Sequence, residues 1–141
     1  MRVEYNGLRF ELPQGWADIT EDLPSGSPPS LARATGVGAV QFSIAKYRGG
    51  KEPRVTLEDL RNFLTEFCER NDMQSDTMID RKSRVMCVAA TSVANGELIT
   101  ANYLSNGRDV VLATYVCADP ESPELKEDLN GVEEIINSMD F

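Results

Sequence analysis

The sequence contains no histidine, and this absence excludes several kinds of chemistry. Histidine is the usual general base near neutral pH and the commonest neutral metal ligand. Catalytic arrangements of the Ser/His/Asp or Cys/His type therefore cannot form. A zinc site would have to rely on cysteine, but Cys68, Cys87 and Cys117 show no CxxC spacing. We expect neither a metal site nor a cofactor.

Cysteine and long apolar runs are also scarce. The three cysteines are widely spaced and lie in apolar patterns, which is typical of buried thiols in a reducing compartment. A disulfide between Cys87 and Cys117 is the alternative if their strands are neighbours. The longest apolar runs, such as residues 110–113, fall far short of the ~20 residues that span a bilayer, and residues 1–10 lack the pattern of a signal peptide. We expect a cytoplasmic protein that does not enter membranes.

Basic residues are rare towards the end of the chain. The net charge is −9, and most of it arises after residue 118, where a single lysine, Lys126, accompanies eight acidic residues. Proteins that bind nucleic acid directly attract the phosphate backbone with lysine and arginine. An acidic field of this kind repels that backbone, so direct nucleic-acid binding is not expected.

Alternating apolar residues and Asn-Gly pairs predict β-hairpins. Asn6 and Gly7 separate two short alternating runs, residues 2–5 and 8–12. Residues 40–47 alternate with period two. The later runs, residues 83–94, 98–104 and 109–117, are joined by Asn-Gly at 95–96 and at 106–107, the pair that tight hairpin turns prefer. The apolar residues of 109–117 occupy both phases, which predicts a sheet covered on both faces.

Two segments have helical periodicity. Thr56 is a candidate N-cap for a helix with Leu57, Leu60, Leu64 and Phe67 on one stripe. A final helix starting at 123–125 turns apolar residues towards the sheet and its acids towards water; the apolar set is Leu125, Leu129, Val132, Ile136 and Met139. We expect one α+β domain over residues 1–141, an α/β/α sandwich with a twisted, mainly antiparallel sheet and helices on both faces.

Shorter motifs have structural explanations. Residues 13–16 break a strand, and the proline-rich residues 24–30 predict a loop. Gly36-Val37-Gly38 lacks the rest of a phosphate-binding loop, so we interpret it as a bend before a strand. Trp16 follows a Pro-x-Gly break, which favours a plug over one end of the core rather than a ligand-stacking ring.

Charged clusters are the candidate sites for a protein partner. Three groups stand out: acids of the final helix, acids that follow Trp16, and a compact basic spot around Gly49 and Gly50. Their members are Glu124, Glu127, Asp128, Glu133 and Glu134; Asp18, Glu21 and Asp22; and Arg48, Lys51 and Arg54. Solvated surface charge is the simpler interpretation of each group.

Three short stretches carry a family resemblance: residues 10–16 (FELPQGW), 110–115 (VVLATY) and 135–139 (IINSM). Together they resemble the PsbP, Ran-binding Mog and DcrB group of folds. The resemblance implies an α/β/α sandwich that binds proteins rather than catalysing a reaction. Residues 38–43, with Tyr47 and the glycines at 49–50, resemble small bacterial proteins found with secreted polymorphic toxins, some of them immunity proteins and others effector chaperones.

These observations lead to three functional hypotheses. The first is an immunity protein that binds and neutralises a secreted toxin, because an acidic surface attracts a basic toxin domain. The second is an adaptor chaperone for the apolar segment of a secretion-system effector, which requires an exposed hydrophobic groove. The third is an enzyme that uses carboxylates alone.

Overall fold

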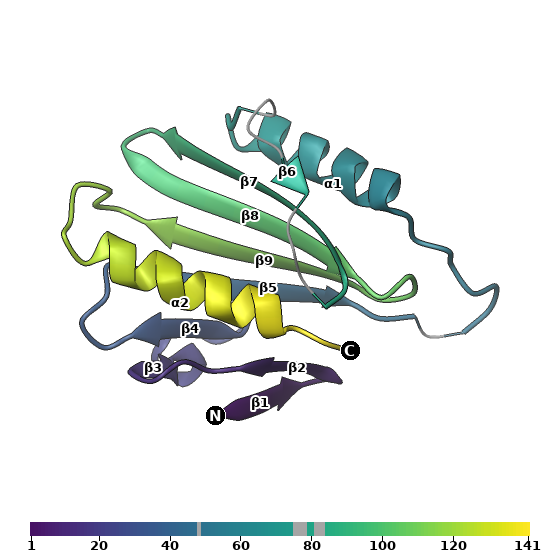
Figure 1. Cartoon of the computed structure of the whole chain (residues 1–141), viewed down its shortest axis with the longest axis horizontal. Coiled ribbons are helices and arrows are strands. Elements are labelled where there is room, and N and C mark those ends of the chain that lie inside the picture. The colour runs from purple at the N-terminus through teal and green to yellow at the C-terminus, as the bar shows by residue number, and fades with distance from the viewer. Residues whose placement is uncertain (48, 75–78, 81–83) are drawn as a thin grey trace.

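The computed structural model describes residues 1–47, 49–74, 79–80 and 84–141. In this part of the chain the elements, in order, are β1 (Arg2–Tyr5), β2 (Leu8–Glu11), β3 (Trp16–Asp18), the 3-10 turn η1 (Thr20–Asp22), β4 (Ser30–Arg33), β5 (Gly38–Ala45), α1 (Leu57–Arg70), β6 (Ile79–Asp80), β7 (Met86–Ala94), β8 (Glu97–Ser105), β9 (Val110–Cys117) and α2 (Leu125–Ser138). The structure is α+β, as the sequence predicts (Figure 1).

Turn and cap residues define several of these elements. Asn6 and Gly7 both have positive φ (48° and 88°), as a tight hairpin turn between β1 and β2 requires. The β8–β9 connection is built differently, because the Asn106 side-chain oxygen accepts hydrogen bonds from the backbone nitrogens of Arg108 and Asp109 (2.9 and 2.8 Å). The predicted N-cap of α1 is confirmed: Thr56 forms a capping box with Asp59.

The larger sheet of the described residues has the strand order β3-β4-β5-β9-β8-β7-β6, and every pair in it is antiparallel. β1 and β2 form a separate hairpin, which joins the end of α2 through two 2.8 Å backbone hydrogen bonds between Arg9 and Asp140. The sequence did not predict β3 and β4, which begin at the last residues of the predicted strand break (13–16) and the predicted loop (24–30). Both are too short for an alternating pattern and depend on pairing between residues 16–18 and 31–33.

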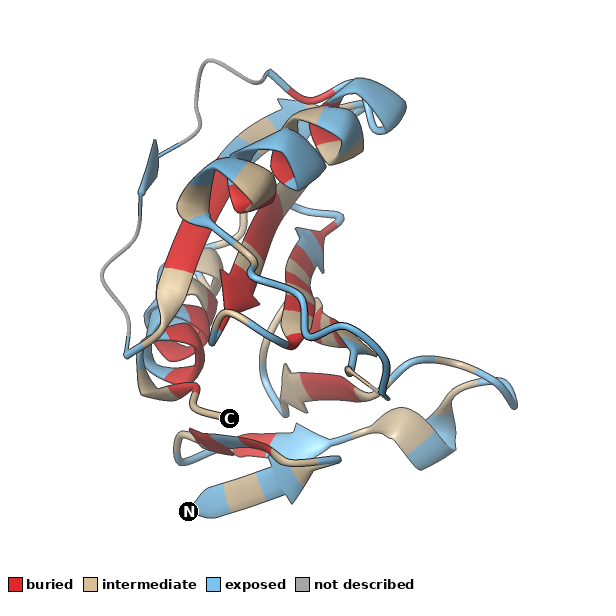
Figure 2. Ribbon diagram, turned by 90° about the vertical axis from the view of Figure 1, so that its right-hand side faces the viewer, coloured by how far each residue is buried: buried red, intermediate tan, exposed pale blue. Residues whose placement is uncertain are grey.

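Two buried clusters lie on opposite phases of the central strands. On β7 and β8, Val88 and Ala101 pack in one cluster with α1, whereas Cys87 and Leu104 belong to the other, together with α2. Side chains one residue apart on a strand point to opposite faces. Each helix therefore covers a different set of strand side chains, and Figure 2 shows the buried residues concentrated on the inner sides of both helices.

Trp16 closes one end of the α2 cluster, as the sequence predicts. Only 7% of its surface is exposed. Its indole lies against Gly131, where an added Cβ would come within 2.3 Å of Nε1. Glycine at this helical position therefore has a packing reason, because it admits the tryptophan ring.

The state of the cysteines agrees with the expectation of buried thiols. Cys68, Cys87 and Cys117 are free and buried. β8 lies between β7 and β9, so Cys87 and Cys117 do not occupy neighbouring strands. Within the described ranges, neither α1 nor α2 has the length and apolar character that crossing a membrane requires.

Candidate binding surfaces

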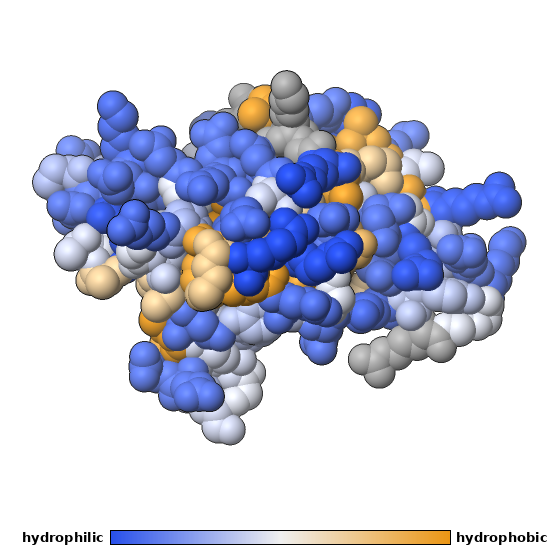
Figure 3. All heavy atoms as spheres, turned by 60° about the horizontal axis from the view of Figure 1, so that its bottom comes forward, coloured by the Kyte–Doolittle hydropathy of each residue, from blue (hydrophilic) through white to orange (hydrophobic). Residues whose placement is uncertain are grey.

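The outer side of α2 carries exposed carboxylates at three of the predicted positions, Glu127, Glu133 and Glu134. Glu124, the residue before the helix, is half-buried and accepts a hydrogen bond from Nη2 of Arg33 at 2.7 Å. Figure 3 turns the lower side of Figure 1 towards the viewer, and most of the molecular surface seen in that view is hydrophilic. An acidic surface on α2 therefore exists, although Glu124 contributes to it only in part.

Asp128 does not belong to this surface, so its prediction as a partner-binding residue is wrong. Its side chain is 0% exposed and faces the sheet. Oδ1 accepts a hydrogen bond from Nε of Arg33 at 2.8 Å, and Oδ2 accepts from the Val37 backbone nitrogen at 2.9 Å and from the Tyr115 hydroxyl at 2.7 Å. A carboxylate tolerates burial when its lone pairs are satisfied in this way. Asp128 ties α2 to β9 and to the β4–β5 connection.

Arg33 is the cation that balances this buried carboxylate. Hydrogen bonds from its guanidinium to Glu124 and Asp128 raise the pKa of Arg33 above the ordinary arginine value, so it stays protonated. Both carboxylates also lie at the start of α2, where the helix dipole favours negative charge. The Asp128–Arg33–Tyr115 group is a structural network.

The sequence contained signals for this network. Asp128 is three residues after Leu125 and four before Val132, which places it inside the apolar stripe of α2. A Cβ added at Gly36 would lie 2.5 Å from Oδ1 of Asp128, and one at Gly38 would lie 2.5 Å from the Val116 carbonyl oxygen. Glycine at these two positions leaves room for the Asp128 carboxylate and the Val116 carbonyl oxygen. The sequence predicted only a bend before the strand and not this close packing.

Alkaline titration should report on Tyr115. Burial, followed by its hydrogen bond to Asp128, raises the pKa of Tyr115 above the ordinary value. Because the folded state retains a proton that the unfolded state releases near pH 10, the free energy of unfolding should decrease above that pH, by about 1.4 kcal/mol per pH unit for this group. Absorbance at 295 nm should show this phenolate forming only with unfolding. Tyr115→Phe should make the alkaline decrease shallower; an unchanged slope would contradict the assignment.

The acids that follow Trp16 are on the surface, but one of them is already occupied. Asp18 accepts hydrogen bonds from the Thr20 hydroxyl and backbone nitrogen (2.6 and 2.9 Å) and from the Tyr5 hydroxyl. The bonds from Thr20 and then Tyr5 lower the pKa of Asp18. Asp18 therefore holds the β3–η1 turn and the N-terminal hairpin together. Glu21 and Asp22 are exposed on η1.

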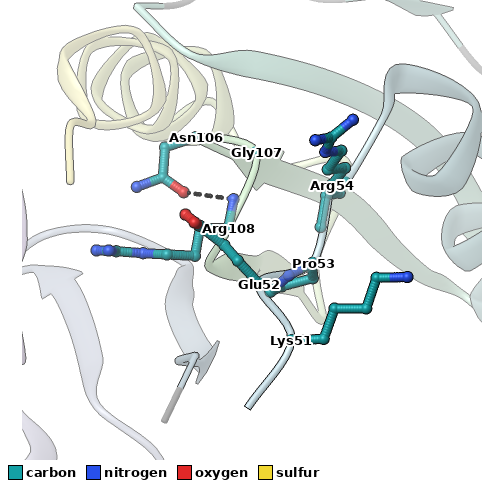
Figure 4. Close-up of a pocket in the computed structure, with 8 residues that line it drawn as sticks. Lys51, Glu52, Pro53, Arg54, Asn106, Gly107 and Arg108 are labelled. Carbon is teal, nitrogen blue, oxygen red and sulfur yellow. Dashed lines mark hydrogen bonds between the residues drawn. The ribbon is translucent and has the colours of Figure 1, made fainter. Parts of the chain in front are cut away.

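The basic spot lies at the other end of the sheet, beside the β8–β9 connection. Lys51 and Arg54 line a hollow of about 1030 Å³ together with Arg108, which the sequence analysis did not include. Figure 4 shows the three side chains extending in different directions, so they do not converge on one point. Arg48, the remaining predicted member, lies outside the described residues.

A further surface, absent from the sequence predictions, is the part of the sheet beside α1. α1 packs on β7 and β8, and Val110 and Leu112 of β9 lie half-buried at the border of its cluster. Among the described residues, the same phase continues past the helix to the exposed side chains of Ser43 on β5 and Val116 on β9. Two hollows of about 180 and 230 Å³ lie there. We call this surface the open half-face; its main floor residues are Gln41, Ser43, Ile99, Tyr103, Val110, Leu112, Thr114 and Val116.

The open half-face is uncharged and partly apolar. None of the described side chains that line its two hollows is charged, although 26% of the residues in the chain are charged. Val116 is 38% exposed. Phe67 and Asn71 of α1 form one wall, and Pro28 lies on the opposite side. The prediction of a sheet covered on both faces therefore does not hold for this half of the α1 side.

No group of three or more cysteine and acidic side chains in the described ranges is placed to hold a metal ion. Among the described residues, the surfaces that a partner can reach include the acidic side of α2, the exposed loops and the open half-face.

Comparison with known proteins gives a likeness of fold. No family model matches the sequence, and no curated protein matches it. A crystal structure from Bacteroides thetaiotaomicron aligns with 94% of this chain at a TM-score of 0.58 and 14% identity. The alignment spans 44% of that structure's chain, so this protein corresponds to less than half of it. At this identity the match shows a shared fold only.

Proposed function

We propose that this chain is a non-catalytic protein-binding domain. The open half-face carries this proposal. Strand positions on the water-facing side of a sheet are usually polar or charged, whereas the described residues here include the half-buried Ile99 and Leu112, the exposed Val116 and no charged side chain. A partly apolar surface without charge among its described residues, on a chain with net charge −9, supports an interaction site.

We also propose that the fold is the α/β/α sandwich of the PsbP, Mog and DcrB group. The support is that α1 packs on one phase of β7 and β8, whereas the cluster that contains α2 takes the opposite phase, with Cys87, Leu104 and Val111. The N-terminal hairpin and the final helix of the resemblance also lie together, through the Arg9–Asp140 pairing. This grouping predicts protein binding rather than catalysis.

Within this class, we propose the role of a cytoplasmic immunity protein for a secreted toxin. The exposed carboxylates of α2, Glu127, Glu133 and Glu134, support this role because complementary charge accelerates the capture of a basic domain. Asp128 has no part in it, because its carboxylate is occupied by Arg33 and Tyr115.

Charge reversal on α2 tests the immunity proposal. Replacing Glu133 and Glu134 by lysine should slow association with the toxin roughly tenfold at low salt and weaken its salt dependence, because electrostatic steering acts mainly on the association rate. Stopped-flow fluorescence measures the rate. The matched control reverses Glu58 and Glu69, two exposed acids of α1. Equal slowing by both pairs would contradict a specific role for α2.

An adaptor chaperone is the second candidate, and the open half-face favours it. That hypothesis requires an exposed hydrophobic groove, and the hollows beside α1 have apolar walls from Phe67, Ile99 and Leu112. An adaptor of this kind should bind an apolar effector segment and form a dimer. Light scattering that shows only monomer would count against it.

The decisive experiment is an affinity purification of the tagged protein from its native cells, with mass spectrometry of the proteins retained in moderate salt. Recovery of one toxin-like polypeptide supports immunity. Recovery of an effector with an apolar segment supports the adaptor role. If nothing specific is retained, the proposal of a protein-binding domain is wrong.

A further inference from the structure

We infer that the open half-face binds one amphipathic α-helix of the partner, lying beside α1 and antiparallel to it. This inference rests on the proposed protein-binding function and identifies the surface and the kind of element that it receives.

The part of the open half-face formed by β9 cannot accept an added strand. The backbone groups of β9 are paired on both sides, with β5 over residues 38–45 and with β8 over residues 98–105. Addition of a strand needs an edge with free N–H and C=O groups. A partner must therefore bind through side chains, which suits the apolar stripe of a helix.

The dimensions of the surface also suit a helix. The hollows share Ser43 and Leu112, and they centre about three residues apart along β9, near Thr114 and near Val111. Three strand residues span roughly 10 Å. Seven helical residues span about the same distance, so side chains at i and i+7 of a helix along β9 would reach both hollows.

A second copy of this chain fits the surface less well. In a face-to-face dimer, the outer side of each α1 would have to cover the partner's open half-face. That side of α1 carries Glu58 and Glu69, both exposed and charged. An uncharged floor would leave these groups without partners, which is costly on burial.

The charges at the two ends of the surface set the direction. Arg54, Arg108 and Lys51 lie at the end where α1 begins, since the Val55 nitrogen bonds the Gly107 carbonyl oxygen at 2.9 Å. At the other end of the surface, Glu97 begins β8 and Asp119 lies two residues after β9. A helix carries partial positive charge at its N-terminus and negative charge at its C-terminus. The partner helix should therefore place its C-terminus at the basic end, opposite in direction to α1.

The first test uses a synthetic probe: a fluorescent 18-residue helix with leucines on one stripe and balanced lysine and glutamate elsewhere, so that it has no net charge. Fluorescence anisotropy should show binding to the wild type, weakened at least tenfold by Val116→Glu. Val93→Glu is the matched control, because Val93 is an exposed strand valine (60%) outside the open half-face. Binding that Val116→Glu leaves unchanged, or no binding at millimolar probe, would overturn the inference. So would equal binding of a proline-containing peptide of the same composition.

Orientation is tested by disulfide trapping, since the native cysteines are buried. A probe with a C-terminal cysteine should trap with the variant Arg54→Cys and not with Glu97→Cys; the reverse result would overturn the direction. A wild-type dimer that Val116→Glu converts to monomer would identify a second copy as the occupant and overturn the inference.

An experiment with the native partner distinguishes the proposed protein-binding function from the proposed binding surface. The affinity purification is repeated with Val116→Glu and Val93→Glu. A partner lost only with Val116→Glu supports the inference. A partner retained equally by both variants leaves the protein-binding function standing but overturns this surface as its site.

Discussion

Replacing Asp128 by alanine is expected to lower the free energy of unfolding by about 3–5 kcal/mol, the usual cost of removing one partner from a buried ion pair. The change would leave the Tyr115 hydroxyl and the Val37 nitrogen without an acceptor inside the protein. The free energy of unfolding of a domain of this size is only about 5–15 kcal/mol, so the substitution would remove a large part of it. Urea denaturation followed by circular dichroism measures the change.

Two variants sharpen this experiment. Asp128→Asn keeps the shape and one acceptor oxygen, so it should cost less than the alanine variant. Glu127→Ala is the matched control, because Glu127 is the neighbouring acid on the exposed side of α2, and it should change stability by less than about 0.5 kcal/mol. Similar losses for Asp128→Ala and Glu127→Ala would show that the Asp128 network does not hold α2 to the sheet.

Gly131→Ala should destabilise the protein by about 1–3 kcal/mol, although alanine favours a helix by about 1 kcal/mol over glycine. The added Cβ would lie 2.3 Å from Nε1 of Trp16, so the indole must move out of its buried position. Trp16 is the only tryptophan. Its fluorescence should therefore shift to longer wavelength as the ring gains exposure to water.

A double-mutant cycle separates packing from helix propensity. Asn130→Ala changes an exposed neighbour on the same helix and should be neutral or slightly stabilising. In a Trp16→Leu background, Gly131→Ala should cost less or become stabilising, because the clashing ring is gone. Equal costs with and without Trp16 would refute the contact.

The predicted elements that appear in the structure were those with strong local signals. Thr56 and Asp59 supply a complete capping box for α1, and Asn6-Gly7 supplies the positive φ values that the first hairpin needs. β3 and β4 had no such signal. They are held by pairing with each other and with β5.

For the candidate sites, sequence position identified charge but not exposure. Glu133 and Glu134 are exposed as expected, whereas Asp128 is buried because its helical phase coincides with the apolar stripe and Arg33 lies opposite. Arg33 is 95 residues away in the sequence, and no local pattern connects the two. The sequence did not predict the open half-face for a related reason. Apolar residues on both phases of β9 predict that both faces of the strand are buried, but they do not show which element covers each face.

The sequence by itself determined the helices, the hairpins, the buried cysteines and the exclusion of histidine chemistry, because these follow from composition and from patterns that span a few residues. Only the tertiary structure decided that α1 packs on β7 and β8 and, among the described residues, leaves Ser43 of β5 and Val116 of β9 exposed. It also decided that one acid of α2 belongs to the core. Both outcomes depend on which segments, far apart in the sequence, pack against each other. The burial of a side chain is determined by that packing and not by the residues next to it in the sequence.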